Sequence, residues 1–357
     1  MKKILFSAYS LDVGGIETAL ITLLKNINND YEITLSLEEK EGIFLKELPK
    51  NIKVIKYKPN NCKVVPIRKV CNLVKQQLFK LKYQNKFDFS ACYATYSYSA
   101  AFVARTASKN NAIWVHNDYM SFYENDVTKY KGFFEKIKVK NFEKIVFVSE
   151  HDKNVFIDNF KELKEKCYDC NNLINYQKIE QKSKEPIEDF EQKSNMITFI
   201  NLGRHDEKQK KLSRIINAVK KLNEEGYIFR VIFIGDGPDT QMYKKQAKGI
   251  RNIEFLGKKA NPYPYLKKSD CLLMSSEFEG YPVVFIESMI LGKPIITTNV
   301  SDSEKEIKDR FGMVVEKSEN GVYEGMKQYL DHGFEMKKFS AEDFNKKIVE
   351  KLRKIIS

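Results

Sequence analysis

Short apolar runs alternate along the first half of the chain with segments whose apolar residues recur at helical spacing. The runs with the composition of β-strands are residues 4–8, 33–37, 54–57, 89–94, 113–116 and 145–148. The first helical pattern follows Gly14-Gly15 and places Ile16, Leu20 and Leu23 on one face. Strands that alternate with helices in this way are typical of a doubly wound domain with a parallel sheet.

The same alternation restarts after a polar segment. Residues 176–195 are mostly charged or polar, which predicts an exposed connector or an irregular start to the next domain. The strands expected beyond it are residues 197–202, 231–234, 253–256, 271–274, 294–298 and 313–315. Residues 341–356 carry an apolar stripe and predict a final amphipathic helix.

These patterns predict an α/β protein with two Rossmann-like, doubly wound domains that face a cleft. The expected parts are a first domain over residues 1–170, a connector over 171–195, a second domain over 196–338, and a C-terminal helix over 339–357. For this helix, the hypothesis is that it packs back on the first domain. The carboxyl ends of strands and the N-termini of the following helices line such a cleft, and helix N-termini favour anionic ligands.

The composition is that of a globular protein, with 357 residues, a net charge of +13 and 42% hydrophobic residues. The first residues turn polar at Ser7, too early for a secretory signal, and no apolar run approaches the roughly 18 residues of a spanning helix. We therefore expect a cytoplasmic protein without disulfides. Cys167-Tyr168-Asp169-Cys170 has the spacing of a metal or redox pair, but no second pair accompanies it.

The segment from Ser276 to Glu287 follows an apolar run and opens a helix, with Pro282 suited to the first helical position. Glu279 is then expected on a loop facing the cleft. Glu287 would lie five residues into the helix, roughly 7.5 Å along its axis. Two carboxylates at this separation can bind two parts of one elongated polar ligand, while the N–H groups at the helix start remain free for a phosphate. The alternative is two exposed, solvated acids.

A second segment, Gly203 to Lys211, follows the strand expected at residues 197–202. It carries Arg204 and, six residues on, Lys210. A planar guanidinium and a point charge at the end of a strand suit a diphosphate. By itself this segment is equally consistent with a solvated basic loop, and Gly235-Asp236-Gly237-Pro238 by itself is only a turn.

Together the motifs resemble the retaining family 4 glycosyltransferases of the GT-B fold. The matching motifs run in the same order over nearly the whole chain and are Gly14-Gly15-Ile16-Glu17, Gly203-Arg204 with Lys210, Gly235-Asp236-Gly237-Pro238, Phe255-Leu256-Gly257, and Glu279-Gly280-Tyr281-Pro282 with Glu287. This resemblance implies that a nucleotide sugar is bound mainly by the second domain. It also implies transfer with the anomeric configuration retained.

The resemblance implies roles for individual residues. Arg204 and Lys210 would bind the donor diphosphate and stabilise the departing nucleotide. Glu279 would hold hydroxyls of the donor sugar. The other expected donor-binding residues are Gly15 and Val283 with Val284 for the phosphates, Leu256 and Gly257 near the base, Glu287 for the ribose hydroxyls, and Gly280, Tyr281 and Pro282 in the motif itself.

His116, in Trp114-Val115-His116-Asn117-Asp118, resembles the family's histidine beside the donor sugar and the acceptor. Without the resemblance, a lone histidine after an apolar strand is more often a structural residue. No candidate nucleophile is evident, so attack by the acceptor hydroxyl on the face of the leaving phosphate is the favoured mechanism. An Asp-x-Asp motif is absent, and no cofactor or metal is expected, because the cationic pair can stabilise the departing charge.

The positive charge is concentrated in two segments of the first domain, Lys50 to Lys86 and Lys129 to Lys144. The first has a helical apolar stripe, and the second interleaves aromatic residues with lysines. Our hypothesis is docking on the anionic inner face of the cell membrane, where a lipid-linked acceptor would be reached. A solvated lysine face is the alternative. No nucleic-acid-binding motif accompanies the charge, so no nucleic-acid partner is expected.

The predicted activity is therefore a retaining, metal-independent hexosyltransferase of cell-surface polysaccharide synthesis, as in capsule or lipopolysaccharide assembly. It would move a hexose-type sugar from a nucleotide sugar, expected to be a UDP-sugar, to a hydroxyl of a saccharide or lipid-linked saccharide. A sugar-nucleotide epimerase of the same fold and a non-catalytic sugar-binding protein are the alternatives. A nicotinamide dehydrogenase is disfavoured because Leu11-Asp12-Val13-Gly14-Gly15 is not a G-x-G-x-x-G motif.

Overall fold

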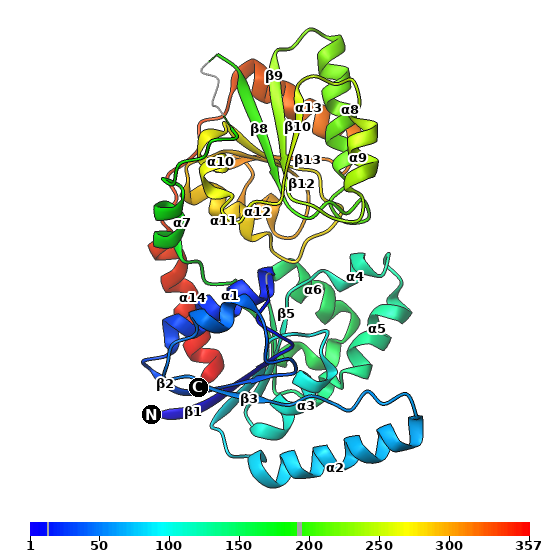
Figure 1. The fold of residues 1–357 in the computed structure, drawn as a ribbon, viewed down its shortest axis with the longest axis vertical. Coiled ribbons are helices and arrows are strands. Elements are labelled where there is room, and N and C mark those ends of the chain that lie inside the picture. The colour runs from blue at the N-terminus through cyan, green and yellow to red at the C-terminus, as the bar shows by residue number, and fades with distance from the viewer. Residues whose placement is uncertain (13, 191–194) are drawn as a thin grey trace. The chain divides into compact units, whose positions relative to one another are not determined.

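The computed structural model describes residues 1–12, 14–190 and 195–357. Val13 in the first glycine motif and residues 191–194 of the expected connector lie outside the described residues. The chain divides into two compact units, Met1–Ile174 with Asn345–Ser357, and Asn175–Phe344 (Figure 1). Each unit is built around its own parallel sheet.

The sheet of the first unit has, within the described residues, seven strands in the order β3-β2-β1-β4-β5-β6-β7. The strands are β1 (Lys2–Ala8), β2 (Tyr31–Leu37), β3 (Lys53–Lys56), β4 (Phe89–Cys92), β5 (Asn111–Val115), β6 (Lys144–Phe147) and β7 (Cys167–Asp169). All neighbouring strands pair in parallel, and the register of β1 on β2 runs from Lys2 opposite Tyr31 to Ala8 opposite Leu37. The central strands are buried on both faces, as parallel sheets require.

Helices connect these strands. They are α1 (Gly15–Ile27), α2 (Val65–Tyr83), α3 (Tyr98–Ala107), α4 (Tyr119–Phe122), α5 (Val127–Lys136) and α6 (Glu150–Asn159), with the 3-10 turns η1 (Ile43–Glu47), η2 (Val139–Asn141) and η3 (Lys161–Lys166). Side-chain caps begin several of them: Ser97 accepts from the N–H of Ala100, and Ser149 accepts from that of Asp152. An aromatic core that includes Phe134 fills one face of the sheet.

The sheet of the second unit has six strands in the described residues, in the order β10-β9-β8-β11-β12-β13. The strands are β8 (Ile197–Leu202), β9 (Phe229–Ile234), β10 (Ile253–Gly257), β11 (Cys271–Met274), β12 (Ile295–Thr298) and β13 (Gly312–Val315). All pairings are parallel. From β8 the chain adds β9 and β10 on one side of the sheet and then β11, β12 and β13 on the other side, so the strand order changes direction between β8 and β11. Ligands bind at such positions in open α/β sheets.

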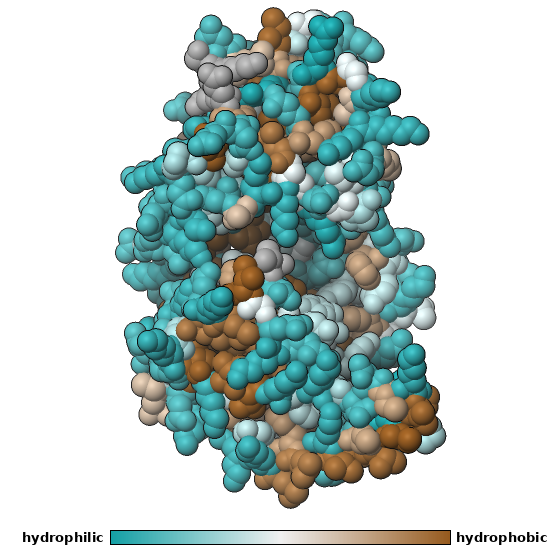
Figure 2. Space-filling view, viewed as in Figure 1, coloured by the Kyte–Doolittle hydropathy of each residue, from teal (hydrophilic) through white to brown (hydrophobic). Residues whose placement is uncertain are grey.

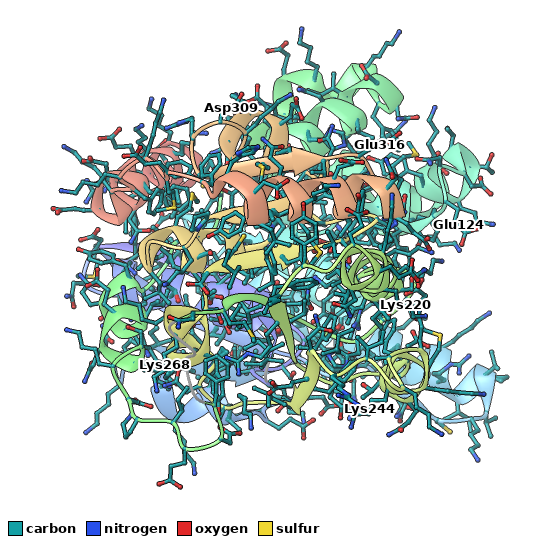
Figure 3. The ribbon with its side chains drawn as sticks, turned by 90° about the horizontal axis from the view of Figure 1, so that it is seen from above. Glu124, Lys220, Lys244, Lys268, Asp309 and Glu316 are labelled. Carbon is teal, nitrogen blue, oxygen red and sulfur yellow. The ribbon has the colours of Figure 1, made fainter. Side chains whose placement is uncertain are left out.

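The helices of the second unit are α7 (Tyr176–Lys182), α8 (Leu212–Glu224), α9 (Thr240–Gln246), α10 (Tyr263–Lys268), α11 (Val283–Ile290), α12 (Ser303–Glu306) and α13 (Glu319–His332). The apolar face of α8, which includes Leu212, Ile215 and Leu222, is buried in the core. Exposed charged residues such as Lys220 and Lys244 lie at the periphery (Figure 3).

The final helix, α14 (Ala341–Ile356), buries Ile348, Leu352, Ile355 and Ile356. From Asn345 onward it belongs to the first unit, where the Asn345 side chain bonds both the N–H and the C=O of Ile174. Lys351 pairs there with Asp169. The predicted pair of Rossmann-like folds and the C-terminal helix are confirmed.

The structure differs from the local predictions in two places. Residues 176–190 are not a plain connector but begin the second unit, because α7 begins at Tyr176 and both Ile179 and Phe190 are buried. Strand β7 was not predicted. Its Cys167 is half-buried and the nearby Cys170 is buried, and burial raises the pKa of both thiols to about 12, whereas cysteines that bind metals or carry out redox reactions need thiolate character.

Among the described residues, none of the helices combines the length and the apolar character that crossing a bilayer requires.

Candidate active site

Three adjacent strands of the second sheet, β9, β8 and β11, end at one edge and continue into the loops that carry the predicted site residues. The loop after β8 lies directly on the loop after β9. The N–H of Gly203 donates to the carbonyl of Ile234 at 3.1 Å. A Cβ at Gly235, where φ is +146°, would lie 1.8 Å from the carbonyl oxygen of Gly203. Glycine is therefore required for this close approach.

His205 fixes the loop that carries Arg204 and Lys210. Its side chain is fully buried, and its ring Nδ1 lies 3.0 Å from the hydroxyl of Thr240. Its backbone N–H donates to Asp236, and its carbonyl accepts from Asp239, each at 3.1 Å. Burial lowers the pKa of His205. This histidine has a structural role: it holds the residues on either side of it in place.

Lys210 and Glu279 form a nearly buried ion pair in the loops after β8 and β11. Lys210 Nζ lies 2.5 Å from Glu279 Oε1, and the two side chains are 17% and 9% exposed. Ser276 Oγ donates to the same oxygen at 2.7 Å, and Gln209 Nε2 donates to Oε2 at 3.4 Å. The carboxylate is thus held by three donors, and the lysine ammonium is fixed at the edge of the sheet.

Arg204 lies at the rim of this cluster, with 61% of its side chain exposed. Its Nη2 pairs with Asp206 Oδ2 at 3.2 Å and donates to Gln209 Oε1 at 3.2 Å. Gln209 therefore links Arg204 to Glu279. The structure brings Lys210 and Glu279 into direct contact and connects Arg204 to them through one amide.

Glu287 lies on α11 and has a different environment from Glu279. The hydroxyl of Tyr263, at the start of α10, donates to Glu287 Oε1 at 3.0 Å. Burial raises the pKa of Glu287 to about 7, and the hydroxyl of Tyr263 opposes this rise. A partly buried carboxylate with few donors is suited to accept hydrogen bonds from hydroxyl groups of a ligand.

Helix α11 begins one residue later than expected. Pro282 is its N-cap and not its first helical residue, so Val283 and Val284 form the first turn. Among the residues that the structure describes, no side chain caps this terminus. The preceding residues are anchored: the Tyr281 hydroxyl donates to Glu306, and the Ser301 hydroxyl donates to the carbonyl of Gly280. The helix start is thus fixed, with its first N–H groups available to an anion.

The base-side residues Leu256 and Gly257 lie at the end of β10. The carbonyl of Gly257 accepts from the N–H of Gly235 at 3.0 Å, so this strand end adjoins the turn after β9. Gly257 has a φ of +70°, which glycine adopts without strain.

Gly15 and His116 belong to the first unit. Gly15 is the first residue of α1, and a Cβ there would meet no atom of the described residues within 4 Å. His116 follows β5, and its ring centroid lies 4.6 Å from that of Tyr93. Burial lowers the pKa of His116 to about 3, so the imidazole is neutral at physiological pH. Its Nε2 is buried and has no hydrogen-bond partner within the part of the chain that the structure describes.

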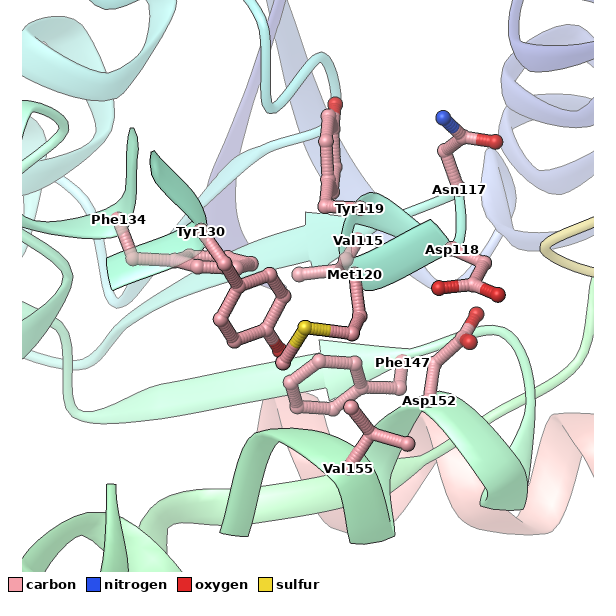
Figure 4. Close-up of a pocket in the computed structure, with 10 residues that line it drawn as sticks. All are labelled: Val115, Asn117, Asp118, Tyr119, Met120, Tyr130, Phe134, Phe147, Asp152 and Val155. Carbon is pink, nitrogen blue, oxygen red and sulfur yellow. The ribbon is translucent and has the colours of Figure 1, made fainter. Parts of the chain in front are cut away.

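The residues after His116 close a narrow space between β5 and α6 (Figure 4). The carboxylates of Asp118 and Asp152 face each other there. Asp118 also caps α4 by accepting from the N–H of Ser121 at 2.9 Å. The space, lined by apolar side chains such as Phe134 and Val155, is too narrow for a water molecule, so it is a packing interface and not a ligand pocket.

The site residues of the second unit fall within one known domain family. Residues 197–332 match the family model described as glycosyl transferases group 1. Lys210, Glu279 and Glu287 all lie inside this range. Residues 197–332 are a group 1 glycosyltransferase domain. The resemblance to glycosyltransferases inferred from the sequence motifs is confirmed for this domain.

Curated relatives extend the likeness beyond the glycosyltransferase domain. An uncharacterized glycosyltransferase of Methanocaldococcus jannaschii is 29% identical over 208 residues, which are 55% of this chain and 49% of that protein. The chain thus spans about half the length of this relative. The N-acetylgalactosamine-N,N'-diacetylbacillosaminyl-diphospho-undecaprenol 4-alpha-N-acetylgalactosaminyltransferase of Campylobacter jejuni is 24% identical over 93% of this chain and 91% of its own.

Solved structures share the fold of the chain. Anabaena HepE, in complex with UDP and glucose, has a TM-score of 0.72 and 16% identity, covering 99% of this chain and all of that one. Staphylococcus aureus TarM, in a complex that contains UDP, has a TM-score of 0.73 and 12% identity, covering 100% of both chains. The GT-B glycosyltransferase fold predicted from the sequence is therefore confirmed.

Three side chains of the glycosyltransferase domain were missed by sequence reasoning. Tyr263 bonds Glu287, while Gln209 and Ser276 bond Glu279. Gln209 and Ser276 adjoin motif residues and could have been inferred as neighbours. Tyr263 lies 24 residues before Glu287, and only the tertiary fold brings the two side chains together.

Proposed function

We propose that this glycosyltransferase moves a hexose-type sugar from a UDP-sugar to a hydroxyl of a saccharide or lipid-linked saccharide in surface polysaccharide synthesis. Two kinds of relative support the proposal. The Campylobacter relative is named for transfer to a diphospho-undecaprenol-linked sugar, and an Erwinia amylovora relative for amylovoran biosynthesis. Structures of HepE contain UDP or UDP-glucose.

The single observation that carries the proposal is the sequestered Lys210–Glu279 pair beside the start of α11. An ammonium group has three N–H donors, so Lys210 can bind Glu279 and a phosphate oxygen together. Arg204, at the rim, supplies a second cation. The N–H groups of Val283 and Val284 complete a cationic surface for a diphosphate. Glu279, held by Lys210, then presents its free lone pairs to hydroxyls of the donor sugar.

The proposed reaction retains the anomeric configuration. The bond between the anomeric carbon and the diphosphate oxygen breaks, and the sugar gains oxocarbenium character. Lys210, Arg204 and the α11 N–H groups stabilise the negative charge that grows on the leaving phosphate. The acceptor hydroxyl attacks the same face, and its proton passes to the leaving phosphate oxygen. His116, neutral because of its burial, would serve as a hydrogen-bonding group near the sugar and not as a cation.

This proposal is tested by incubating the full chain with UDP-sugars and a saccharide acceptor. We expect UDP release that depends on the acceptor, and an anomeric proton coupling in the product that matches the donor's configuration. Release of UDP with an inverted product would contradict the retaining mechanism. Conversion of the donor to its C2 epimer without an acceptor would favour the epimerase alternative.

Metal independence is part of the proposal and is tested with EDTA. We expect turnover in EDTA to stay within twofold of turnover in magnesium, because lysine, arginine and helix N–H groups supply the electrostatic stabilisation. Asp118, His151 and Asp152 of the first unit do place potential ligand atoms within 4.8 Å of one another. A loss of activity in EDTA that added magnesium or manganese restores would therefore contradict metal independence.

Tyr263 is expected to position Glu287 for the donor ribose. In Tyr263→Phe, we expect the donor KM to rise about tenfold with kcat changed less than twofold, since a hydrogen bond to a carboxylate contributes roughly 1.5–3 kcal/mol. The matched control is Tyr265→Phe on the same helix, whose hydroxyl donates to Asp189 instead. A donor KM equal to that of the unaltered chain, measured by initial rates, would remove this role.

The membrane hypothesis belongs to the same proposal. A lipid-linked acceptor is presented at a bilayer surface, and the first unit carries the basic segments Lys50 to Lys86 and Lys129 to Lys144. We propose a cytoplasmic enzyme that works at the inner membrane face. The two segments differ in structure, which decides how docking occurs.

A further inference from the structure

Helix α2 exposes nearly all of its apolar side chains. Of its 19 residues, the single buried one is Phe79. The exposed fractions of the apolar stripe are 52% for Ile67, 61% for Val70, 53% for Val74, 61% for Leu78 and 81% for Leu81. An amphipathic helix of a soluble domain normally turns such a stripe toward the core. Here the stripe is left without cover, and Figure 2 shows hydrophobic side chains gathered over α2.

A second, separate face of α2 attaches the helix to the first unit. Phe79 packs on Tyr57 and Phe102, with ring centroids 4.9 and 5.9 Å apart, and Tyr83 extends this contact. At roughly 100° per residue, every member of the stripe lies at least about 100° around the helix from Phe79. The helix is therefore anchored by its aromatic face, while the stripe points away from the core of the unit.

Positive charge flanks the stripe on both sides. Lys75 and Lys82 lie along one border, and Lys69 and Lys80 lie along the other, since residues seven or eleven apart share a face. No acidic residue occurs between Glu47 and Asp88. An apolar stripe between two basic borders is the arrangement of helices that lie in the interface of an anionic bilayer.

The second basic segment has the opposite arrangement. Its aromatic residues Tyr130, Phe134 and Phe142 are buried in the core of the first unit, and Phe133 is partly buried against the same core, so the exposed side chains of this segment are charged or polar. The segment interleaves aromatic residues with lysines, as the sequence shows, but the core holds the aromatic rings. We therefore interpret it as a solvated charged face, which was the alternative to membrane docking.

We propose that α2 inserts its apolar stripe into the headgroup and acyl boundary of an anionic bilayer, with the flanking cations on lipid phosphates. Pairing with a second copy of the chain is disfavoured, because a symmetric contact would bring identical basic borders together with no acid between them. The proposal deepens, and rests on, the proposed work at a lipid-linked acceptor. Its test uses no donor or acceptor, so its failure leaves the transfer reaction standing.

The test is co-sedimentation of the full chain with vesicles of phosphatidylcholine, with or without about 30% phosphatidylglycerol. We expect binding to the anionic vesicles, weakened but not abolished at about 0.5 M salt. The variant Val74→Ser/Leu78→Ser/Leu81→Ser keeps every charge and should bind at least tenfold more weakly. The matched control Lys136→Gln/Lys140→Gln on the second segment should bind within twofold of the unaltered chain. Equal binding of the triple-serine variant, or no binding by the unaltered chain, overturns the proposal.

Two further measurements identify what covers the stripe. In Leu78→Trp, the new indole should be quenched by lipids with brominated acyl chains, whereas the buried Trp114 of the unaltered chain should not be. An unquenched indole on bound vesicles would mean that α2 stays outside the bilayer. Light scattering should show equal masses for the unaltered and triple-serine chains. A dimer that only the triple-serine change dissociates would assign the stripe to a contact between copies and overturn the proposal.

Discussion

Replacing Lys210 with glutamine is expected to lower kcat for sugar transfer by about 10²- to 10³-fold, the usual effect of removing a group that stabilises developing negative charge. The ammonium lies 2.5 Å from Glu279 and is mostly shielded from solvent, so its charge is poorly replaced by water. Glutamine keeps a donor near Glu279 but removes the charge. The measurement is UDP release in the presence of acceptor, with donor KM determined in parallel.

The matched control is Lys220→Gln, which removes one exposed lysine from α8, about 12 Å along the helix from its start. We expect this variant to transfer sugar at the unaltered rate. Circular dichroism should show both variants folded. A Lys210→Gln enzyme with an unchanged kcat would show that the Lys210–Glu279 pair is only a structural ion pair and that the leaving group is stabilised elsewhere.

Replacing Glu287 with glutamine is expected to have two opposite effects. Donor affinity should fall by about 100-fold, because ribose hydroxyls lose a charged acceptor and hydrogen bonds to charged groups contribute roughly 1.5–3 kcal/mol each. At alkaline pH and without ligand, the free energy of unfolding of Glu287→Gln should be higher than that of the unaltered chain. Replacing a residue that only packs in the core would not lower donor affinity and raise stability together.

The rise in stability follows from the pKa of Glu287, which burial raises from 4.5 to about 7. The folded chain therefore binds the proton more tightly than the unfolded chain does. The stability from the protonated carboxyl is fully present below about pH 4.5 and is lost as pH rises through 7. Above pH 7 the buried carboxylate costs on the order of 1–3 kcal/mol, which the neutral amide of Glu287→Gln avoids.

Thermal unfolding with and without UDP measures both effects. The unaltered chain should lose stability between about pH 5 and 8 as the Glu287 carboxyl loses its proton. In Glu287→Gln, the free energy of unfolding should depend less steeply on pH over this range. UDP should raise the melting temperature of the unaltered chain far more than that of the variant. Equal UDP-induced shifts in the two proteins would remove the ribose assignment, while an unchanged pH slope would remove only the pKa argument.

The sequence was informative where the apolar face of a helix, an apolar strand run or a short local motif determines the structure. The apolar stripe of α8 and the strand runs predicted the two parallel sheets, because these patterns determine which residues are buried. The spacing between Arg204 and Lys210 and the motif that begins at Glu279 were recognised because the residues of each lie close together in the sequence. Strand β7 was missed because its three residues, Cys167 to Asp169, carry no apolar run.

Other features depend on packing that no local pattern encodes. The Tyr263 hydroxyl reaches Glu287 only after α10 and α11 are placed together. His205 gave no functional signal, yet it joins the loops after β8 and β9. The two basic segments have similar compositions, but Phe134 is buried and Leu78 is exposed. That difference arises from which helix face the rest of the unit covers.

The most direct test of the account is an experimental structure of the full chain with UDP bound. The account predicts diphosphate oxygens on Lys210 and Arg204 and on the N–H groups of Val283 and Val284, with the ribose hydroxyls on Glu287. A diphosphate bound elsewhere, with the Lys210–Glu279 pair unchanged and Glu287 still bonded to Tyr263 alone, would contradict it.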